Sequence, residues 1–124
     1  MKYYSMYEDE NQNIKFEIAG CPRNCAACKF IKPTDGLIFD KVQEQILLNL
    51  TEDFPDRNLI VFGEDPLFCG NRNTLTKLFK LLKEKNNTYI LVKTRYNWDR
   101  IKHLEMFNYV DRVEASNVHT DILH

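Results

Sequence analysis

Residues 59–92 have the sequence LIVFGEDPLFCGNRNTLTKLFKLLKEKNNTYILV. The stretch begins with the continuous apolar run Leu59–Phe62, typical of a strand covered on both faces, and ends with a second predicted strand, Tyr89–Val92. Between the two strands, a turn-rich segment leads into a helical pattern whose apolar positions are Leu75, Leu78, Phe79 and Leu82. A helix of this length can cross back over a sheet, so we expect parallel strands joined by a right-handed crossover.

The alternation of strand and helix extends upstream of this stretch. Ile14–Ile18 alternates strictly between apolar and polar residues, which is the period of a half-buried strand. Asp40 is predicted to cap a helix that runs to about Glu52. The helix is expected to have one apolar face, formed by Val42, Ile46, Leu47 and Leu50.

Downstream, the sequence predicts a third helix and a fourth strand. The helix covers roughly Asn97–Phe107, and its expected inward positions are Trp98, Ile101, Leu104 and Phe107. The short strand covers Tyr109–Val113. The resulting order predicts an α/β fold with a short parallel sheet of about four strands and crossover helices. The 124 residues are expected to form one domain, 1–124, too short for a complete eight-stranded barrel.

Composition excludes several classes of function. Lys and Arg number 17 and Asp and Glu 18, whereas a dedicated binder of nucleic acid or membrane surface would carry a basic excess. No apolar run approaches the length that spans a bilayer, and the polar segment Met1–Asn13 contains no signal-peptide core. We therefore expect a cytoplasmic protein with neither nucleic acid nor membrane as a partner.

Three of the four cysteines, Cys21, Cys25 and Cys28, form a C-x3-C-x2-C run. In a reducing cytosol such a cluster indicates metal binding or catalysis rather than disulfides. Three thiolates on a short loop suit a polynuclear iron–sulfur cluster or a soft divalent metal. A cluster of four irons would keep one iron without a protein ligand, and an incomplete shell is open to substrate.

The predicted topology also brings distant segments together. In a parallel sheet every strand-to-helix loop leaves at the same edge, which is the edge that carries α/β active sites. The cysteine loop, Gly63–Pro66 and Thr94–Tyr96 each follow a predicted strand. We expect these three segments to converge on one site.

Four segments resemble the radical S-adenosylmethionine (radical SAM) superfamily, and within it the small activating proteins of anaerobic ribonucleotide reductase. The first is Ile18–Pro22 with the cysteine spacing that follows it. Gly63–Leu67 is similar to that family's Gly-Gly-Asp/Glu-Pro-Leu, and Val92–Tyr96 to its strand-end Thr-Gly-Tyr. Val110–Arg112 lies where the family has a late Val-Asp-Gly. The resemblance covers roughly residues 15–123.

The resemblance implies a partial, TIM-like barrel and a radical SAM activating enzyme. A 4Fe–4S cluster would be held by Cys21, Cys25 and Cys28, and its open iron would chelate SAM. Asp65 would accept from the methionine ammonium, within a cofactor-binding set formed by Gly63, Glu64, Asp65, Pro66 and Thr94. Reductive cleavage would give a 5′-deoxyadenosyl radical, which would install a glycyl radical on the large reductase subunit. Reduced flavodoxin or ferredoxin would be the electron donor.

Two other functions stay open. Glu64 and Arg95 stand where the resembled family has glycine, which favours a non-catalytic single-cluster electron carrier or sensor that does not bind SAM. The other is a zinc-stabilised binding module, its site completed by Cys69 or a histidine. Cys69 itself is expected to be a half-buried thiol, because free cysteine packs as a small hydrophobic residue.

Overall fold

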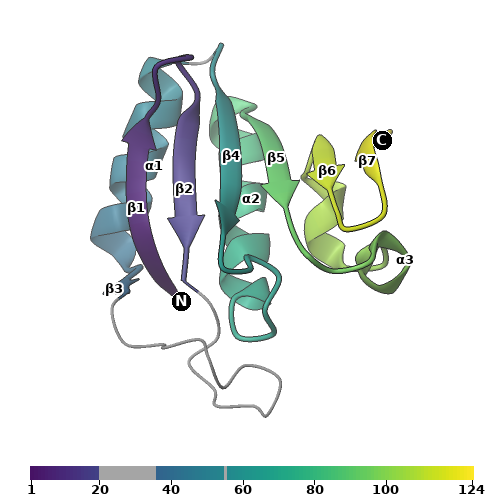
Figure 1. The fold of residues 1–124 in the computed structure, drawn as a ribbon. Helices are drawn as coiled ribbons and strands as arrows, with labels where there is room; N and C mark the ends of the chain where they lie inside the picture. The colour runs from purple at the N-terminus through teal and green to yellow at the C-terminus, as the bar shows by residue number, and fades with distance from the viewer. Residues whose placement is uncertain (20–35, 55) are drawn as a thin grey trace.

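The computed structural model describes residues 1–19, 36–54 and 56–124. These residues form one mixed sheet of seven strands in the order β3-β1-β2-β4-β5-β6-β7, together with three α-helices (Figure 1). The strands are β1 (Lys2–Glu8), β2 (Ile14–Ile18), β3 (Leu37–Ile38), β4 (Asn58–Gly63), β5 (Tyr89–Lys93), β6 (Arg112–Glu114) and β7 (His119–Asp121). The helices are α1 (Lys41–Asp53), α2 (Arg72–Asn86), α3 (Trp98–Ile101) and the 3₁₀ helix Glu105–Asn108.

The centre of the sheet confirms the predicted α/β arrangement. β2, β4, β5 and β6 are neighbours and run parallel, with Phe16 opposite Val61 and Val61 opposite Val92. In Figure 1 both α1 and α2 lie behind the sheet, on the same face. Right-handed crossovers between parallel neighbours place successive helices on one side in this way.

The sheet is larger than predicted, and the described residues do not show a partial TIM-like barrel. Antiparallel strands border the parallel centre, with β1 and β3 on one side and β7 on the other. The sequence pattern did not reveal β1 because the register shifts between Tyr3 and Ser5. A β-bulge of this kind breaks the period of two. Tyr3 and Met6, three residues apart, consequently both pack on the core.

Helix α1 begins as predicted and buries only part of the expected face: Leu47 is buried and Leu50 packs against the core. Asp40 accepts from the backbone N–H groups of Val42 and Gln43, and the Gln43 side chain accepts from the Asp40 N–H in a capping box. Leu47, Leu48 and Thr51 are the buried positions. Val42 is 62% exposed and Ile46 44%, so their predicted inward orientation is wrong.

The buried side of α1 includes a polar residue, Thr51. Its hydroxyl donates to the carbonyls of Leu47 and Leu48 within the helix, and it accepts from the Asn86 side chain at 2.7 Å. A polar residue whose hydrogen bonds are satisfied in this way can face the core. Sequence patterning places threonine on the solvent side of a helix. The predicted apolar face of α1 was therefore centred away from Thr51, toward Val42 and Ile46.

The predicted third helix is divided into α3 and the 3₁₀ helix. Ile101, Met106 and Phe107 are all buried. A continuous helix with 3.6 residues per turn would turn Met106 about 140° away from Ile101. The break places all three in the core, and it brings the rings of Trp98 and Phe107 into an edge contact at 4.9 Å between centroids.

The predicted fourth strand starts three residues late. Tyr109 ends the 3₁₀ helix, where its N–H donates to the Met106 carbonyl. The Asp111 side chain accepts from the Ile90 N–H at 2.8 Å and pairs with Lys83. The Asp111 N–H also donates to the Ile90 carbonyl at 2.8 Å, and the strand register with β5 runs from Arg112 onward.

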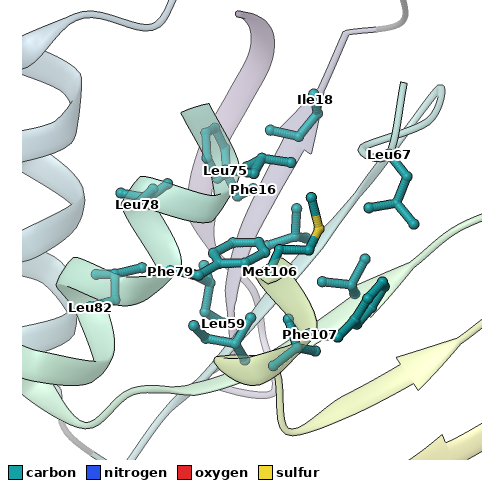
Figure 2. Close-up of a cluster of buried hydrophobic side chains, with 14 of the residues drawn as sticks. Phe16, Ile18, Leu59, Leu67, Leu75, Leu78, Phe79, Leu82, Met106 and Phe107 are labelled. Atoms are coloured by element: carbon teal, nitrogen blue, oxygen red, sulfur yellow. The ribbon is translucent and has the colours of Figure 1, made fainter. Parts of the chain in front are cut away.

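The core fills the space between the sheet and the helices behind it. Figure 2 shows its side chains converging from β2, β4, α2 and the 3₁₀ helix. Fully or almost fully buried members include Phe16, Ile18, Leu59, Leu67, Leu75, Leu78, Phe79, Leu82, Met106 and Phe107. Because Leu67 lies in the segment between β4 and α2, the core also fixes the loop that follows β4.

Candidate functional site

The carboxyl ends of β2, β4 and β5 meet at one edge of the sheet, the lower edge in Figure 1. Two hydrogen bonds join the segment after β4 to the end of β2. The Glu64 N–H donates to the Ile18 carbonyl at 3.2 Å, and the Asn71 side chain donates to the Ala19 carbonyl at 3.2 Å. The described end of β2 and the segment after β4 therefore lie together, while the expected place of the cysteine loop falls outside the described residues.

Ala19 and Gly36, which flank residues 20–35, lie close together. A Cβ added to Gly36 would stand 3.1 Å from the Ala19 Cβ and 2.8 Å from the Lys2 Cβ, so no larger residue fits without movement. The Ala19 N–H also donates to the Lys2 carbonyl at 3.0 Å. Ala19 and Gly36 thus form a narrow pair of flanking residues, called the base below, and both contact Lys2 of β1. The predicted metal ligands Cys21, Cys25 and Cys28 lie between them, outside the described residues.

Gly63 is required at the end of β4. Its φ is +130°, a conformation that side chains rarely adopt, and a Cβ there would approach the Ile18 carbonyl oxygen to 2.2 Å. The close approach lets β2 and the segment after β4 share the hydrogen bond from Glu64. Gly63 therefore sets where the two acidic residues after it stand.

Asp65 is 8% exposed and joins the two loops that follow β4 and β5. Its Oδ1 accepts from the Leu67 N–H at 3.0 Å and the Thr94 hydroxyl at 2.9 Å. Its Oδ2 accepts from the Arg95 N–H at 3.1 Å. The predicted residues Asp65 and Thr94 are thus brought into direct contact, and Pro66 is buried beside them. Three internal donors make this carboxylate a brace between loops.

Glu64 precedes Asp65 in the chain, and only one of its two carboxylate oxygens has a hydrogen-bond partner among the described residues. Its Oε1 accepts from the Tyr4 hydroxyl, which reaches it from β1. Its Oε2 is buried and has no hydrogen-bond partner among the described residues. The side chain borders a cavity of about 240 Å³ that is lined by Phe62, Gly63, Glu64, Lys93, Thr94 and Arg95.

The third segment is ordered by Thr94. Its N–H donates to the Glu114 carbonyl at 2.9 Å, and its hydroxyl oxygen accepts from the Tyr96 N–H at 3.1 Å. Burial raises the pKa of Tyr96 above its ordinary value of 10.0, and the nearby Asp65 carboxylate raises it further.

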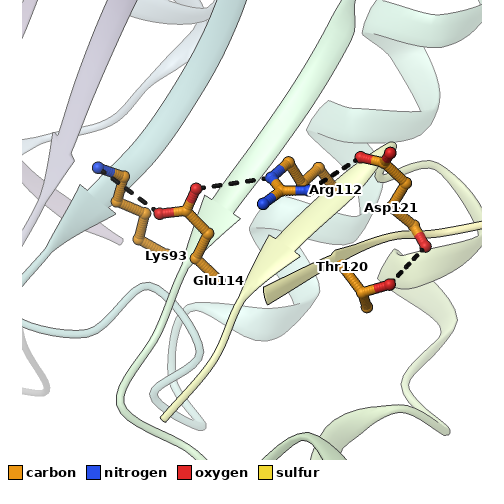
Figure 3. Close-up of polar contacts among 5 residues, drawn as sticks. All are labelled: Lys93, Arg112, Glu114, Thr120 and Asp121. Carbon is orange, nitrogen blue, oxygen red and sulfur yellow. Dashed lines mark hydrogen bonds and ion pairs between the residues drawn. The ribbon is translucent and has the colours of Figure 1, made fainter. Parts of the chain in front are cut away.

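Ion pairs continue from the cavity toward the C-terminal strands, as Figure 3 shows. Lys93 lies 3.9 Å from Glu114, and Glu114 and Asp121 flank Arg112 at 3.6 and 3.1 Å. The hydrogen bond to Asp121 raises the pKa of Arg112 above its ordinary value. Such partly exposed pairs add little to stability, but they place Lys93 and its charge at the rim of the cavity.

A protein-family model described as a 4Fe-4S single cluster domain matches residues 12–120, which is most of the chain. The chain belongs to this family. Separate comparisons with curated proteins and with solved structures gave no match. No helix in the described ranges is long and apolar enough to cross a membrane.

The chemistry of the chain fits the cluster of a 4Fe–4S single cluster domain. The C-x3-C-x2-C run supplies three thiolates, the ligands that such clusters use. Within the part of the chain that the structure describes, no three His, Cys, Asp or Glu side chains could together hold a metal ion. Cys69 is exposed there, not half-buried as predicted. The roles of Cys21, Cys25 and Cys28 stay predictions.

Sequence reasoning missed two residues of this single cluster domain. Tyr4 was overlooked because β1 was not predicted, and only its place in an aromatic run, Tyr3-Tyr4, could have drawn attention to it. Asn71 stands at the start of α2 without a side-chain capping bond. It is 3% exposed and holds the Ala19 carbonyl instead. An asparagine before a helix predicts a cap, so sequence alone gave no sign of this second role.

Proposed function

We propose that the protein holds its 4Fe–4S cluster through Cys21, Cys25 and Cys28 and uses it to cleave SAM reductively. One observation carries the proposal: the base formed by Ala19 and Gly36 lies at the same sheet edge as the cavity bordered by Gly63, Glu64 and Thr94. A ligand bound in this cavity would lie at the edge where Ala19 and Gly36, the described flanks of the cysteine segment, are found. The buried, unpartnered oxygen of Glu64 and the tight backbone at Gly63 suit a polar ligand that approaches closely.

The proposed reaction needs one electron for each SAM. Cys21, Cys25 and Cys28 would hold the cluster, which would supply that electron to the sulfonium; breakage of the bond between sulfur and C5′ would give methionine and a 5′-deoxyadenosyl radical. That radical would take a hydrogen atom from a glycine Cα of a partner protein, which would give 5′-deoxyadenosine and a glycyl radical. The chain's own residues would orient SAM and exclude water, while the cofactors carry the chemistry.

The proposed partner is a glycyl-radical enzyme, with the large subunit of anaerobic ribonucleotide reductase as the leading candidate. Reduced flavodoxin or ferredoxin would donate the electron. In the described residues α1 and α2 cover only one face of the sheet (Figure 1). An uncovered face beside the site would let a loop of a large protein approach the radical.

The test uses the full chain, purified and reconstituted without oxygen. We expect a brown protein with about four irons per chain, the stoichiometry of a cubane cluster. SAM should change the electron paramagnetic resonance spectrum of the reduced cluster, and dithionite with SAM should release 5′-deoxyadenosine. A fully loaded protein that shows neither effect would exclude SAM cleavage.

Cysteine variants identify the ligands in the same preparation. Cys21→Ser, Cys25→Ser and Cys28→Ser should each abolish the cluster, whereas Cys69→Ser, at an exposed position, should retain it. Loss of iron in Cys69→Ser would mean four protein ligands and no open iron. A colourless protein with one bound zinc would overturn the assignment of the metal.

A second candidate function is a single-cluster electron carrier or sensor. The observation that favours it is the internal hydrogen bonding of Asp65, because the carboxylate predicted to receive the methionine ammonium already accepts three hydrogen bonds from its own chain. A carrier would reduce and reoxidise reversibly, and its spectrum would not respond to SAM. The spectroscopic experiment above therefore separates the two functions.

A further inference from the structure

The two acidic residues after β4 have different hydrogen-bond states. Asp65 accepts three internal bonds and is 8% exposed, so an incoming donor would compete with Leu67, Thr94 and Arg95 for its lone pairs. Two of these donors are backbone N–H groups, which cannot turn away without moving the loops. Three of the four acceptor positions of the Asp65 carboxylate are therefore already used to brace the loops.

The Glu64 carboxylate, in contrast, has one oxygen with a hydrogen-bond partner and one without. The Tyr4 hydroxyl fixes its Oε1, and its Oε2 is buried with no hydrogen-bond partner in the described ranges. A buried carboxylate oxygen without a donor is costly, because it has lost water and gained nothing in return. Lys93 and Arg95 line the same cavity, but the described ion pairs do not include Glu64, and Lys93 pairs with Glu114.

The position of Glu64 is rigid. Its own N–H donates to the Ile18 carbonyl at 3.2 Å, and Gly63 before it cannot be replaced without a clash with Ile18. Ile18 is followed by Ala19, so Glu64 stands next to the start of the segment that contains the three clustered cysteines. A preorganised acceptor at this place suits a positively charged donor on a ligand bound in the cavity.

We propose that Glu64, and not Asp65, is the carboxylate that receives the amino group of SAM, while Asp65 is a positioning residue that braces the loops after β4 and β5. The inference rests on the proposed function, because it takes SAM as the ligand. Tyr4 contributes by holding Oε1, which orients the carboxylate and leaves Oε2 for the amino group.

The first measurement is thermal unfolding of the protein without SAM. Glu64→Gln keeps the shape of the side chain and an oxygen for Tyr4, so its melting temperature should equal or exceed that of the wild type. Asp65→Asn cannot serve all three donors and should melt lower by about 5 °C or more. A loss in Glu64→Gln as large as that in Asp65→Asn would make Glu64 structural and overturn the proposal.

The second measurement is binding of SAM, and of an analogue that lacks the α-amino group, to cluster-loaded protein. Glu64→Gln should weaken SAM binding about 10- to 100-fold, the worth of a charge-assisted hydrogen bond. It should bind the desamino analogue as the wild type does, because the group that Glu64 recognises is missing. Glu17→Gln, a matched change on β2 where Glu17 bonds Ser5, should alter neither affinity.

The outcomes distinguish the role of Glu64 from the binding of SAM itself. Equal loss of both ligands in Glu64→Gln, or no loss of SAM, would overturn the assignment of the amino group to Glu64 and leave SAM binding intact as a function. A selective loss of SAM in Asp65→Asn, with Glu64→Gln unaffected, would return the role to Asp65. A wild-type protein that binds neither ligand would overturn the proposed function itself, and the inference with it.

Discussion

Gly63 shows how one residue can set the geometry of the site. Gly63→Ala would put a Cβ 2.2 Å from the Ile18 carbonyl oxygen at a φ of +130°. Neither backbone can yield easily, so we expect a loss of unfolding free energy of about 3 kcal/mol or more. Denaturant unfolding measures this loss. Gly70→Ala is the control, since a Cβ at Gly70 meets nothing within 4 Å, and equal losses in the two variants would contradict the explanation.

Two tyrosines link stability to alkaline pH. Burial, followed by nearby carboxylates, raises the pKa of Tyr96 and of Tyr89 in the folded protein above the value of 10.0 expected when unfolded. The folded state therefore holds these protons longer, and the stability they contribute is complete below pH 10 and is lost as pH rises through the folded values. The free energy of unfolding should fall above pH 10, and less steeply in Tyr89→Phe/Tyr96→Phe. Identical slopes in the double variant and the wild type would exclude this linkage.

At the scale of single residues, the sequence located the candidate site better than it assigned roles within it. The pattern Gly63-Glu64-Asp65-Pro66 and the residue Thr94 were predicted to share one edge, and the structure brings them together. The hydrogen bonds that Asp65 accepts come from Leu67, Thr94 and Arg95. The hydrogen bond that Glu64 accepts comes from Tyr4, on a strand that was not predicted. Such pairings arise only from tertiary structure.

At the scale of elements, helix α1 offers a direct test of a cap that the sequence predicted. Asp40→Ala removes the acceptor for the N–H groups of Val42 and Gln43, and should cost about 1 kcal/mol of unfolding free energy. Lys41→Ala is the control, because the Lys41 side chain is 94% exposed and its pair with Glu44 contributes little. A cost no greater than that of the control, measured by urea unfolding, would mean that the capping box does not stabilise α1.

The elements that sequence predicted well are those with an unbroken period. β2 matches its predicted bounds, and α2 has its expected inward positions, Leu75, Leu78, Phe79 and Leu82. Errors arose where tertiary contacts override the period: the bulge in β1, the hydrogen-bonded Thr51 in α1, and the divided segment after Asn97. In each case the local period that sequence analysis detects is interrupted.

At the scale of the whole molecule, Asn71 connects α2, the end of β2 and the start of the cysteine segment. Its side chain donates to the Ala19 carbonyl at 3.2 Å, and the residue is 3% exposed. Asn71→Ala removes this tie at one end of the cysteine segment but leaves the core of the sheet unchanged. We therefore expect the far-ultraviolet circular dichroism to stay the same while the bound cluster becomes easier to lose.

The measurement is the rate at which an iron chelator removes iron from anaerobically loaded protein. Asn71→Ala should lose iron several-fold faster than the wild type, because one buried hydrogen bond of about 1 kcal/mol no longer holds the start of the segment. Asn73→Ala, at an exposed position on the same helix, is the matched control and should lose iron at the wild-type rate. Equal rates in all three proteins would show that the hydrogen bond from Asn71 to Ala19 does not affect how firmly the cluster is bound. The cysteine segment would then be stabilised by its own residues and its metal, independently of the sheet edge from which it leaves.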